Sequence, residues 1–129
     1  MLLDEAIWTY LSGITDLVEK VPAASIQWGD AEQETAVPRV VYRRISAPTM
    51  YDATDQWQRW ELITVHTDKY ECREIANLIS EALNRFKGAD QGTFGGMDVD
   101  YIEKIEDPDP ALRTDGRYEI IQEFRFIFH

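Results

Sequence analysis

The sequence is poor in the residues that build metal sites and reactive centres. It holds one cysteine, Cys72, and two histidines, His66 and His129. A single cysteine cannot form a disulfide within the chain, which fits a reducing compartment. A zinc-type site needs three or four suitably spaced His, Cys or carboxylate ligands, and this sequence does not supply them. We expect Cys72, on the apolar stripe of a predicted helix, to be a buried core thiol, and His66 to be a structural imidazole.

Motifs that bind phosphate or carry out catalysis are also missing. The glycine-rich stretch 88–96 matches no phosphate-binding spacing, and no serine lies in a nucleophile elbow. Asp98 and Asp100 share one side of an alternating segment, a pattern that can hold a divalent metal. The same alternation is typical of the solvated face of a strand, and we favour that interpretation. The sequence therefore predicts no catalytic residue, no metal site, no cofactor and no enzymatic activity.

Basic charge and long apolar runs are scarce as well. Asp and Glu outnumber Lys and Arg by 24 to 13, for a net charge of -11. A protein that neutralises DNA phosphates needs a basic face, so binding to duplex DNA is disfavoured. An acidic surface instead repels the DNA backbone. The acidic start differs from a secretory signal, and no stretch approaches the roughly 20 apolar residues of a membrane span. We expect a protein that is made and used in the cytoplasm unless something carries it elsewhere.

Two amphipathic helices are predicted from apolar residues that recur at three- and four-residue steps. The first runs from Asp4 to Val21. The second begins at Asp68, which has capping-box spacing with Glu71, and runs to about Lys87, with Gly88 as its stop. The length of 129 residues and the apolar fraction of 44% fit one domain that spans 1–129.

Strand patterns fill most of the remaining sequence. The predicted strands cover 25–28, 39–45, 57–67, 97–106 and 117–129. In the fourth, alternation places Met97, Val99, Tyr101 and Ile105 on one face. Hairpin loops join most consecutive strands, so we expect an α+β fold: a mostly antiparallel sheet of about four to five strands, with the two helices packed on one face. The third and last strands run about eleven residues, roughly 36 Å, long enough to project from the body and pair with a neighbour.

The order of these segments is similar to that of a known family. A strand begins at Pro38-Arg39, the strand Arg59–Thr67 runs directly into a helix at Asp68, and the chain closes on the aromatic strand Phe124–Phe128. Over nearly the whole chain, this order resembles the tail completion or tail terminator proteins of long-tailed bacteriophages. The resemblance implies a single tail-terminator-like domain with no cofactor. No functional residue of the family can be transferred to a position in this sequence.

The resemblance also implies a role in assembly. Such proteins form a ring, typically of six copies, on the last ring of the tail tube, where they end its polymerisation. The partners would be other copies of the chain, the tail tube protein and the head-side connector or stopper protein. DNA would pass through the hole without specific binding, and no membrane is involved. The location would be the head-proximal end of the tail in the virion, after assembly in the host cytoplasm.

Apolar residues in or beside loops are the candidate contacts, because loops carry recognition on a rigid scaffold. The five candidates are Met50, Tyr51, Trp57, Phe94 and Met97. We expect them to bury against neighbouring subunits. Two alternatives remain open: a related head–tail neck protein, such as a stopper or adaptor, or a small α+β ligand-binding domain or enzyme. The last would need a concave apolar site with converging polar groups.

Overall fold

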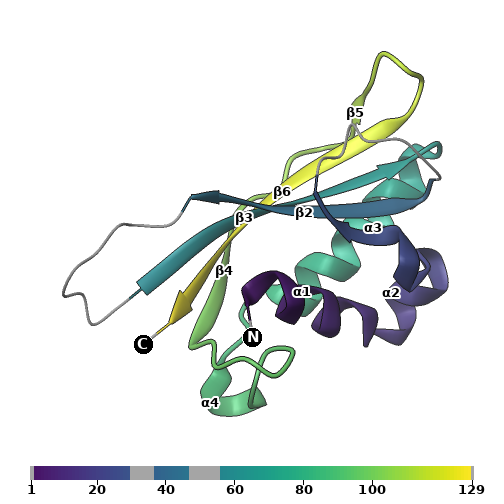
Figure 1. The fold of residues 1–129 in the computed structure, drawn as a ribbon. Coiled ribbons are helices and arrows are strands. Elements are labelled where there is room, and N and C mark those ends of the chain that lie inside the picture. The colour runs from purple at the N-terminus through teal and green to yellow at the C-terminus, as the bar shows by residue number, and fades with distance from the viewer. Residues whose placement is uncertain (1, 30–36, 47–55, 129) are drawn as a thin grey trace.

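The computed structural model describes residues 2–29, 37–46 and 56–128, which form helices and one mixed sheet (Figure 1). The helices are α1 Leu3–Ser12, α2 Thr15–Lys20, α3 Lys69–Leu83 and α4 Gly88–Gln91, with a 3-10 turn at Ala23–Ser25. The strands are β1 Ile26–Trp28, β2 Arg39–Ser46, β3 Gln56–His66, β4 Tyr101–Glu106, β5 Ala111–Leu112 and β6 Tyr118–Phe128. The prediction of an α+β fold with a mostly antiparallel sheet is confirmed.

The sheet has the order β1-β2-β3-β6-β4, with β5 also paired to β6. The described residues thus form six strands, against the four to five expected. The β1–β2 pair is parallel, and the other described pairs are antiparallel. The helices α1, α2 and α3 lie together on one side of the sheet (Figure 1). Side chains from these helices and from the strands above them share one apolar core.

The first predicted helix is broken in two. It ends at Ser12, and a second helix begins at Thr15 after Ile14, whose backbone is extended. Gly13 lies at the break between the two helices. A glycine inside a helix would destabilise it by about 1 kcal/mol relative to alanine, which favours a break at this position. The change of direction lets both pieces turn apolar side chains inward, since Leu11 of α1 and Leu17 of α2 are both fully buried.

The second helix begins as predicted but ends early. The Asp68 side chain accepts hydrogen bonds from the backbone N–H groups of Tyr70, at 2.8 Å, and Glu71, at 3.0 Å. The helix stops at Leu83 and not at Lys87, because Arg85 adopts a left-handed conformation with φ of 69° and its N–H donates to Ile102. The backbone of Arg85 and Phe86 pairs with Ile102 of β4 and so does not form the last turn of the predicted helix. Gly88, the predicted stop, instead begins α4.

The fourth strand is shorter than predicted and shows a different face to the core. It starts at Tyr101, and the buried residue is Ile102, while Tyr101 remains 39% exposed. The expectation that Tyr101 lies on a core face with Met97 was therefore wrong. A tight turn in which Phe94 and Met97 exchange backbone hydrogen bonds occupies the preceding residues, and a register shift between Lys104 and Glu106 interrupts the alternation.

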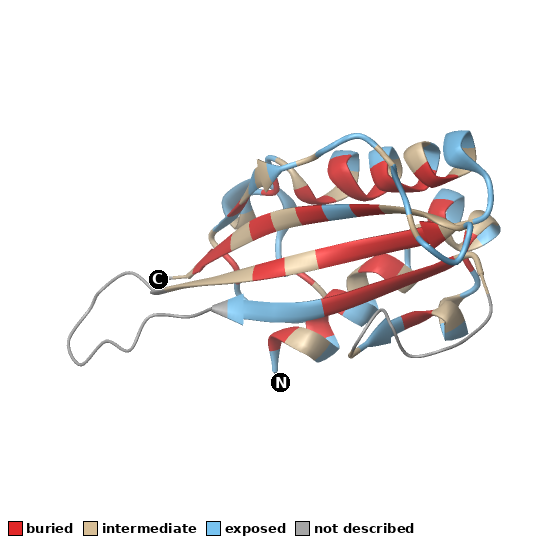
Figure 2. Cartoon of the chain, turned by 90° about the horizontal axis from the view of Figure 1, so that it is seen from above, coloured by how far each residue is buried: buried red, intermediate tan, exposed pale blue. Residues whose placement is uncertain are grey.

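The two long strands form the middle of the sheet. β3 and β6 pair along their whole length, from Gln56 opposite Phe128 to His66 opposite Tyr118. Their ends near Gln56 and Phe128 extend past the helices (Figure 1). Burial decreases toward this end along β3, and β2 changes from buried to exposed after Tyr42, whereas β6 keeps Phe126 buried there (Figure 2). The extended end is therefore where the sheet offers surface that its own helices do not cover.

Candidate assembly surface

A groove of about 350 Å³ opens on the helix side of the sheet, where β2 and β3 pass the start of α1. Three separate parts of the chain contribute to it: the start of α1, the edge strand β1 and the extended ends of β2 and β3. The groove is lined by Leu2, Leu3, Asp4, Trp28, Arg43, Arg44, Gln58 and Trp60. It lies directly beside the core, because Leu3 and Trp60 belong to the buried cluster.

Two large apolar side chains at this groove are exposed. Leu2 is 67% and Trp28 is 64% exposed, whereas Trp60 is only 4% exposed. The indole N–H of Trp60 donates to Gln58 Oε1 at 3.0 Å, which satisfies its polar atom within the wall. Exposed apolar groups that gather at a hollow with a polar rim are typical of an interaction site. Strand β1 adds to this character, since among the described strands it pairs with β2 alone.

The polar part of the groove is mainly basic. Arg43 pairs with Glu61 across the β2–β3 ladder, which leaves its side chain 48% exposed. Arg44 is exposed and forms no ion pair with any residue that the structure describes. Asp4 contributes the single acidic side chain of the lining. Because Glu61 offsets the charge of Arg43, Arg44 is the main positive charge that this apolar groove offers to a partner, on a chain whose net charge is -11.

The opposite face of the sheet carries a ladder of charged pairs. Arg59 pairs with Glu123 across β3 and β6, and Arg125 pairs with Glu103 at 3.1 Å across β6 and β4. The Arg125 guanidinium also lies 5.8 Å from the centre of the Trp57 ring. Arg59 lies directly opposite Arg125, but Arg43, Arg59 and Arg125 each pair with a glutamate on a neighbouring strand, so the charges of this face largely cancel.

The predicted contact residues lie in different parts of the chain, and those that the structure describes differ in burial. Met50 and Tyr51 lie outside the described residues. Trp57 is half-buried on the charged outer face. Phe94 is fully buried, with its ring stacked 4.4 Å from that of Tyr10, which corrects the expectation that it contacts a neighbouring subunit. Met97 is partly buried against the same core. The glycine-rich segment carries these two side chains into the core of its own chain, a destination that sequence spacing did not reveal.

The side chains best suited to chemistry serve the fold. Burial raises the pKa of Cys72 to about 11, and its Sγ lies 3.5 Å from the carbonyl oxygen of Thr64, as expected of a core thiol. His66 Nδ1 accepts a hydrogen bond from the Asp68 N–H at 2.9 Å, which supports the start of α3. Asp98 is exposed, and within the described part of the chain no three His, Cys, Asp or Glu residues group as a metal site. His129 lies outside the described residues.

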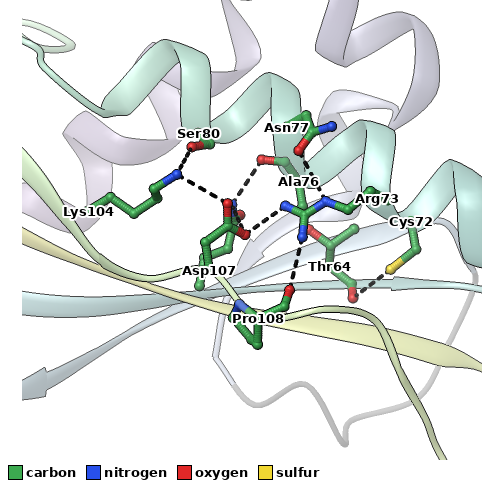
Figure 3. A network of polar contacts seen from close by, with 10 residues as sticks. Thr64, Cys72, Arg73, Ala76, Asn77, Ser80, Lys104, Asp107 and Pro108 are labelled. Carbon is green, nitrogen blue, oxygen red and sulfur yellow. Dashed lines mark hydrogen bonds and ion pairs between the residues drawn. The ribbon is translucent and has the colours of Figure 1, made fainter.

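A polar network joins α3 to the strands at Asp107 (Figure 3). Arg73 donates to Asp107 Oδ1 at 2.6 Å, Lys104 lies 3.2 Å from Oδ2, and Gln122 donates to Oδ1 at 3.2 Å. Burial by itself would raise the pKa of Asp107. The hydrogen bonds and positive charges of Arg73 and Lys104 outweigh burial and hold this pKa below its ordinary value. The arrangement ties α3 to β6 and to the segment that follows β4.

The groove was not predicted from the sequence. One usable signal was Trp28, a large aromatic residue on a predicted strand of a few residues that is followed by an acidic stretch. A short strand buries little surface, so such a tryptophan is a candidate for exposure. Arg44 gave no signal of its own, because its position in the groove depends on where α1 begins.

No helix among the described residues is long and apolar enough to cross a membrane.

No family model and no curated protein matches this chain. Among solved structures, the chain is similar to a protein in the structure described as "Virion of native gene transfer agent (GTA) particle". The chain has the fold of a virion component. The TM-score is 0.74 at 15% sequence identity, and the match covers 97% of this chain and 92% of the virion chain. At this identity the similarity establishes the fold, and it extends over nearly the whole of both chains.

Proposed function

We propose that this chain is a structural subunit of a virion, and more specifically of the tail terminator ring of a phage or prophage tail. The ring caps the tail tube, ends its polymerisation and forms the surface that joins the head. The observation that carries the proposal is the fold shared with a gene transfer agent virion protein over 97% of this chain. The segment order of the sequence, which resembles tail terminator proteins, gives independent support.

The surface of the chain fits a role in assembly. A ring subunit needs two different, complementary faces, one for each neighbour. The groove beside β1 exposes Trp28 and Leu2, and tryptophan is among the residues that most often dominate interface energies. Other copies of the chain, the tail tube protein and the head-side connector are the partners that this role requires. No enzymatic activity or cofactor is part of the proposal.

The charge of the chain fits a path for DNA. A net charge of -11 per subunit repels phosphates, so DNA can slide through a ring of such subunits without adhering. The charged pairs on the outer sheet face largely cancel, so the acidic excess lies elsewhere on the surface. The ring would be located at the head-proximal end of the tail, after assembly in the host cytoplasm.

Tail tubes polymerised in the presence of the purified protein test the proposal. We expect rings at one end of each tube in negative-stain micrographs, and shorter tubes as the protein concentration rises. Tubes that grow to the same length and carry no cap, together with a protein that stays monomeric at millimolar concentration, would contradict a terminator role.

Met50 and Tyr51 give this test a specific variant. Replacing both with serine should weaken capping and leave the circular dichroism spectrum of the monomer unchanged, because we propose that they contact a neighbour. The matched control is Ala53→Ser with Thr54→Ser, close by in the sequence, which should cap normally. Equal capping by the two double variants would remove Met50 and Tyr51 from the interface.

A head–tail neck protein, such as a stopper or adaptor, is the second candidate, because the same fold similarity to a virion protein supports it. The two roles differ in their neighbours. Separate pull-downs against the tube protein and the head connector distinguish them: a terminator retains the tube protein, whereas an adaptor retains only the connector.

A further inference from the structure

The two edges of the sheet differ in the charge that they offer to a neighbour. β1 and β4 are the opposite edges. Gln58 in the groove lies opposite Phe126, which lies opposite Ile102 on β4. The N–H of Asp100 donates to the carbonyl of Ile127 at 2.8 Å, so Asp100 lies at this same end. Asp100 is therefore nearest in level to the Gln58 end of the groove. Arg44 lies opposite Trp60, and Trp28 lies opposite Tyr42, so a neighbour shifted along the strands would bring its Asp98 and Asp100 to Arg44.

The groove on the β1 side is basic and apolar. Arg43 and Arg44 line the groove with Asp4 as the only acid, and Trp28 and Leu2 are exposed at it. An occupant that fits this site must supply carboxylates together with some apolar surface. Charge complementarity of this kind directs which surfaces meet and in which register.

The β4 side supplies both. Asp90 and Asp98 are exposed and Asp100 is half-buried, and the basic side chains that accompany them on the segment beside β4 are Arg85 and Lys87. Asp98 and Asp100 line a shallow hollow with Gly88, Gly92 and Thr93. The next residue, Tyr101, is 39% exposed and offers an aromatic ring for contact with another apolar group. This edge, defined here as the acidic edge, thus has the chemistry that the groove requires.

We propose that the groove receives the acidic edge of a second copy of this chain, in a head-to-tail contact. The inference rests on the proposed ring and names the surfaces that close it. Asp98 and Asp100 of one copy lie beside Arg44 of the next, and Trp28 packs against Tyr101. The two surfaces are different and lie on opposite edges, so a pair of copies retains one free groove and one free acidic edge. A repeated contact of this type generates rings when the rotation between copies closes.

Charge reversal tests the contact. Arg44→Glu and Asp98→Arg should each weaken self-association by about tenfold or more, because each places like charges together. The double variant with both changes restores opposite charges at every contact, and should associate within about threefold of the unaltered chain. Lys69→Glu and Asp109→Arg are matched controls on exposed residues outside both surfaces, and should associate normally. The measurements are sedimentation velocity over a concentration series and ring counts on tail tubes.

The outcomes separate this contact from the broader proposal. If the unaltered chain forms rings or caps tubes, but both single variants do so equally well, the contact is wrong and the ring stands. If the double variant folds by circular dichroism but assembles no better than either single variant, the pairing of these two surfaces is likewise wrong. If the unaltered chain neither self-associates at millimolar concentration nor caps tubes, the terminator ring fails and this contact fails with it.

Discussion

The two edges of the sheet are completed in different ways. Beside β4, the backbone at Arg85 and Phe86 exchanges hydrogen bonds with Ile102, at 3.2 and 3.1 Å, and Phe94 then enters the core. Beside β1, the chain provides a three-residue strand that ends on a tryptophan with 64% of its surface exposed. One edge is closed by its own chain, and the other keeps apolar surface exposed to solvent.

This difference suggests that the β4 side mainly stabilises the fold, whereas the β1 edge mainly contacts other chains. Unpaired strand edges invite contact with other chains, and proteins usually protect them. Here the segment after α3 protects the β4 edge with buried aromatic rings and backbone hydrogen bonds. Substitutions of the buried residues on the β4 side should therefore lower the free energy of unfolding, whereas substitutions of the exposed residues at the β1 edge should change assembly.

The largest effect is expected at Gly95, in the turn that closes the β4 side. Its φ is +57°, and a Cβ at this position would lie 2.2 Å from the carbonyl oxygen of Ala6 in α1. Gly95→Ala combines left-handed strain with overpacking against backbone, so it should cost roughly 2–4 kcal/mol of stability. Urea denaturation measures this loss. Gly92→Ala is the control, because Gly92 also has a positive φ but no neighbour within 4 Å of its added Cβ. Equal losses in the two variants would show that crowding against α1 contributes nothing.

A smaller loss is expected at Asp107, which joins α3 to the β4 side. Asp107→Asn removes the charge that pairs with Arg73 and Lys104, whose side chains are 25% and 30% exposed. Leaving these partly buried cations without their partner should cost about 2 kcal/mol. Thermal or urea unfolding measures the change. Asp109→Asn, on a nearby exposed residue, should leave stability unchanged, and a loss equal to that of Asp107→Asn would contradict the role of the network.

The same network predicts a dependence on pH. Because the folded-state pKa of Asp107 is lowered, its stabilisation is complete above the ordinary carboxyl pKa of about 4. It is lost as the pH falls below that value toward the folded pKa. The stability difference between the unaltered chain and Asp107→Asn should therefore shrink between about pH 5 and about pH 3. A difference that stays constant over this range would show that the charge of Asp107 is not what stabilises the contact.

The smallest effect on stability is expected at Trp28. Its side chain is largely exposed, so Trp28→Ser should change the free energy of unfolding by less than about 0.5 kcal/mol. Ring formation should nevertheless be weakened, since an exposed tryptophan at an interface often contributes much of the binding energy. Gln27→Ser, at the exposed neighbour on the same strand, is the control. A large loss of stability in Trp28→Ser would show that this edge supports the fold as much as the β4 edge does.

The features that sequence predicted well depend on neighbouring residues. The cap at Asp68 needs only the N–H groups of Tyr70 and Glu71, and the alternation of Ile120, Phe124 and Phe126 needs only the pleat of one strand. Both are therefore visible in a short stretch of sequence.

The features that it missed depend on distant contacts. The helix ends at Leu83 because the following residues pair with β4, and no local signal marks that choice. The groove was invisible for the same reason, since Leu2, Trp28 and Arg44 meet only after three segments have packed together. The order of helices and strands along the chain was still largely predictable, because each element follows from the apolar pattern of its own residues.

The position of β6 has a consequence for synthesis. This strand pairs with β3, β4 and β5, yet it follows all of them along the chain. During translation, β2 and β3 can form a hairpin early, but β4 and β5 have no partner strand until β6 leaves the ribosome. Sheets that join segments far apart in sequence form slowly, because long loops must close first. The β3, β4 and β5 edges therefore stay exposed until β6 has been synthesised, and its arrival completes this part of the sheet.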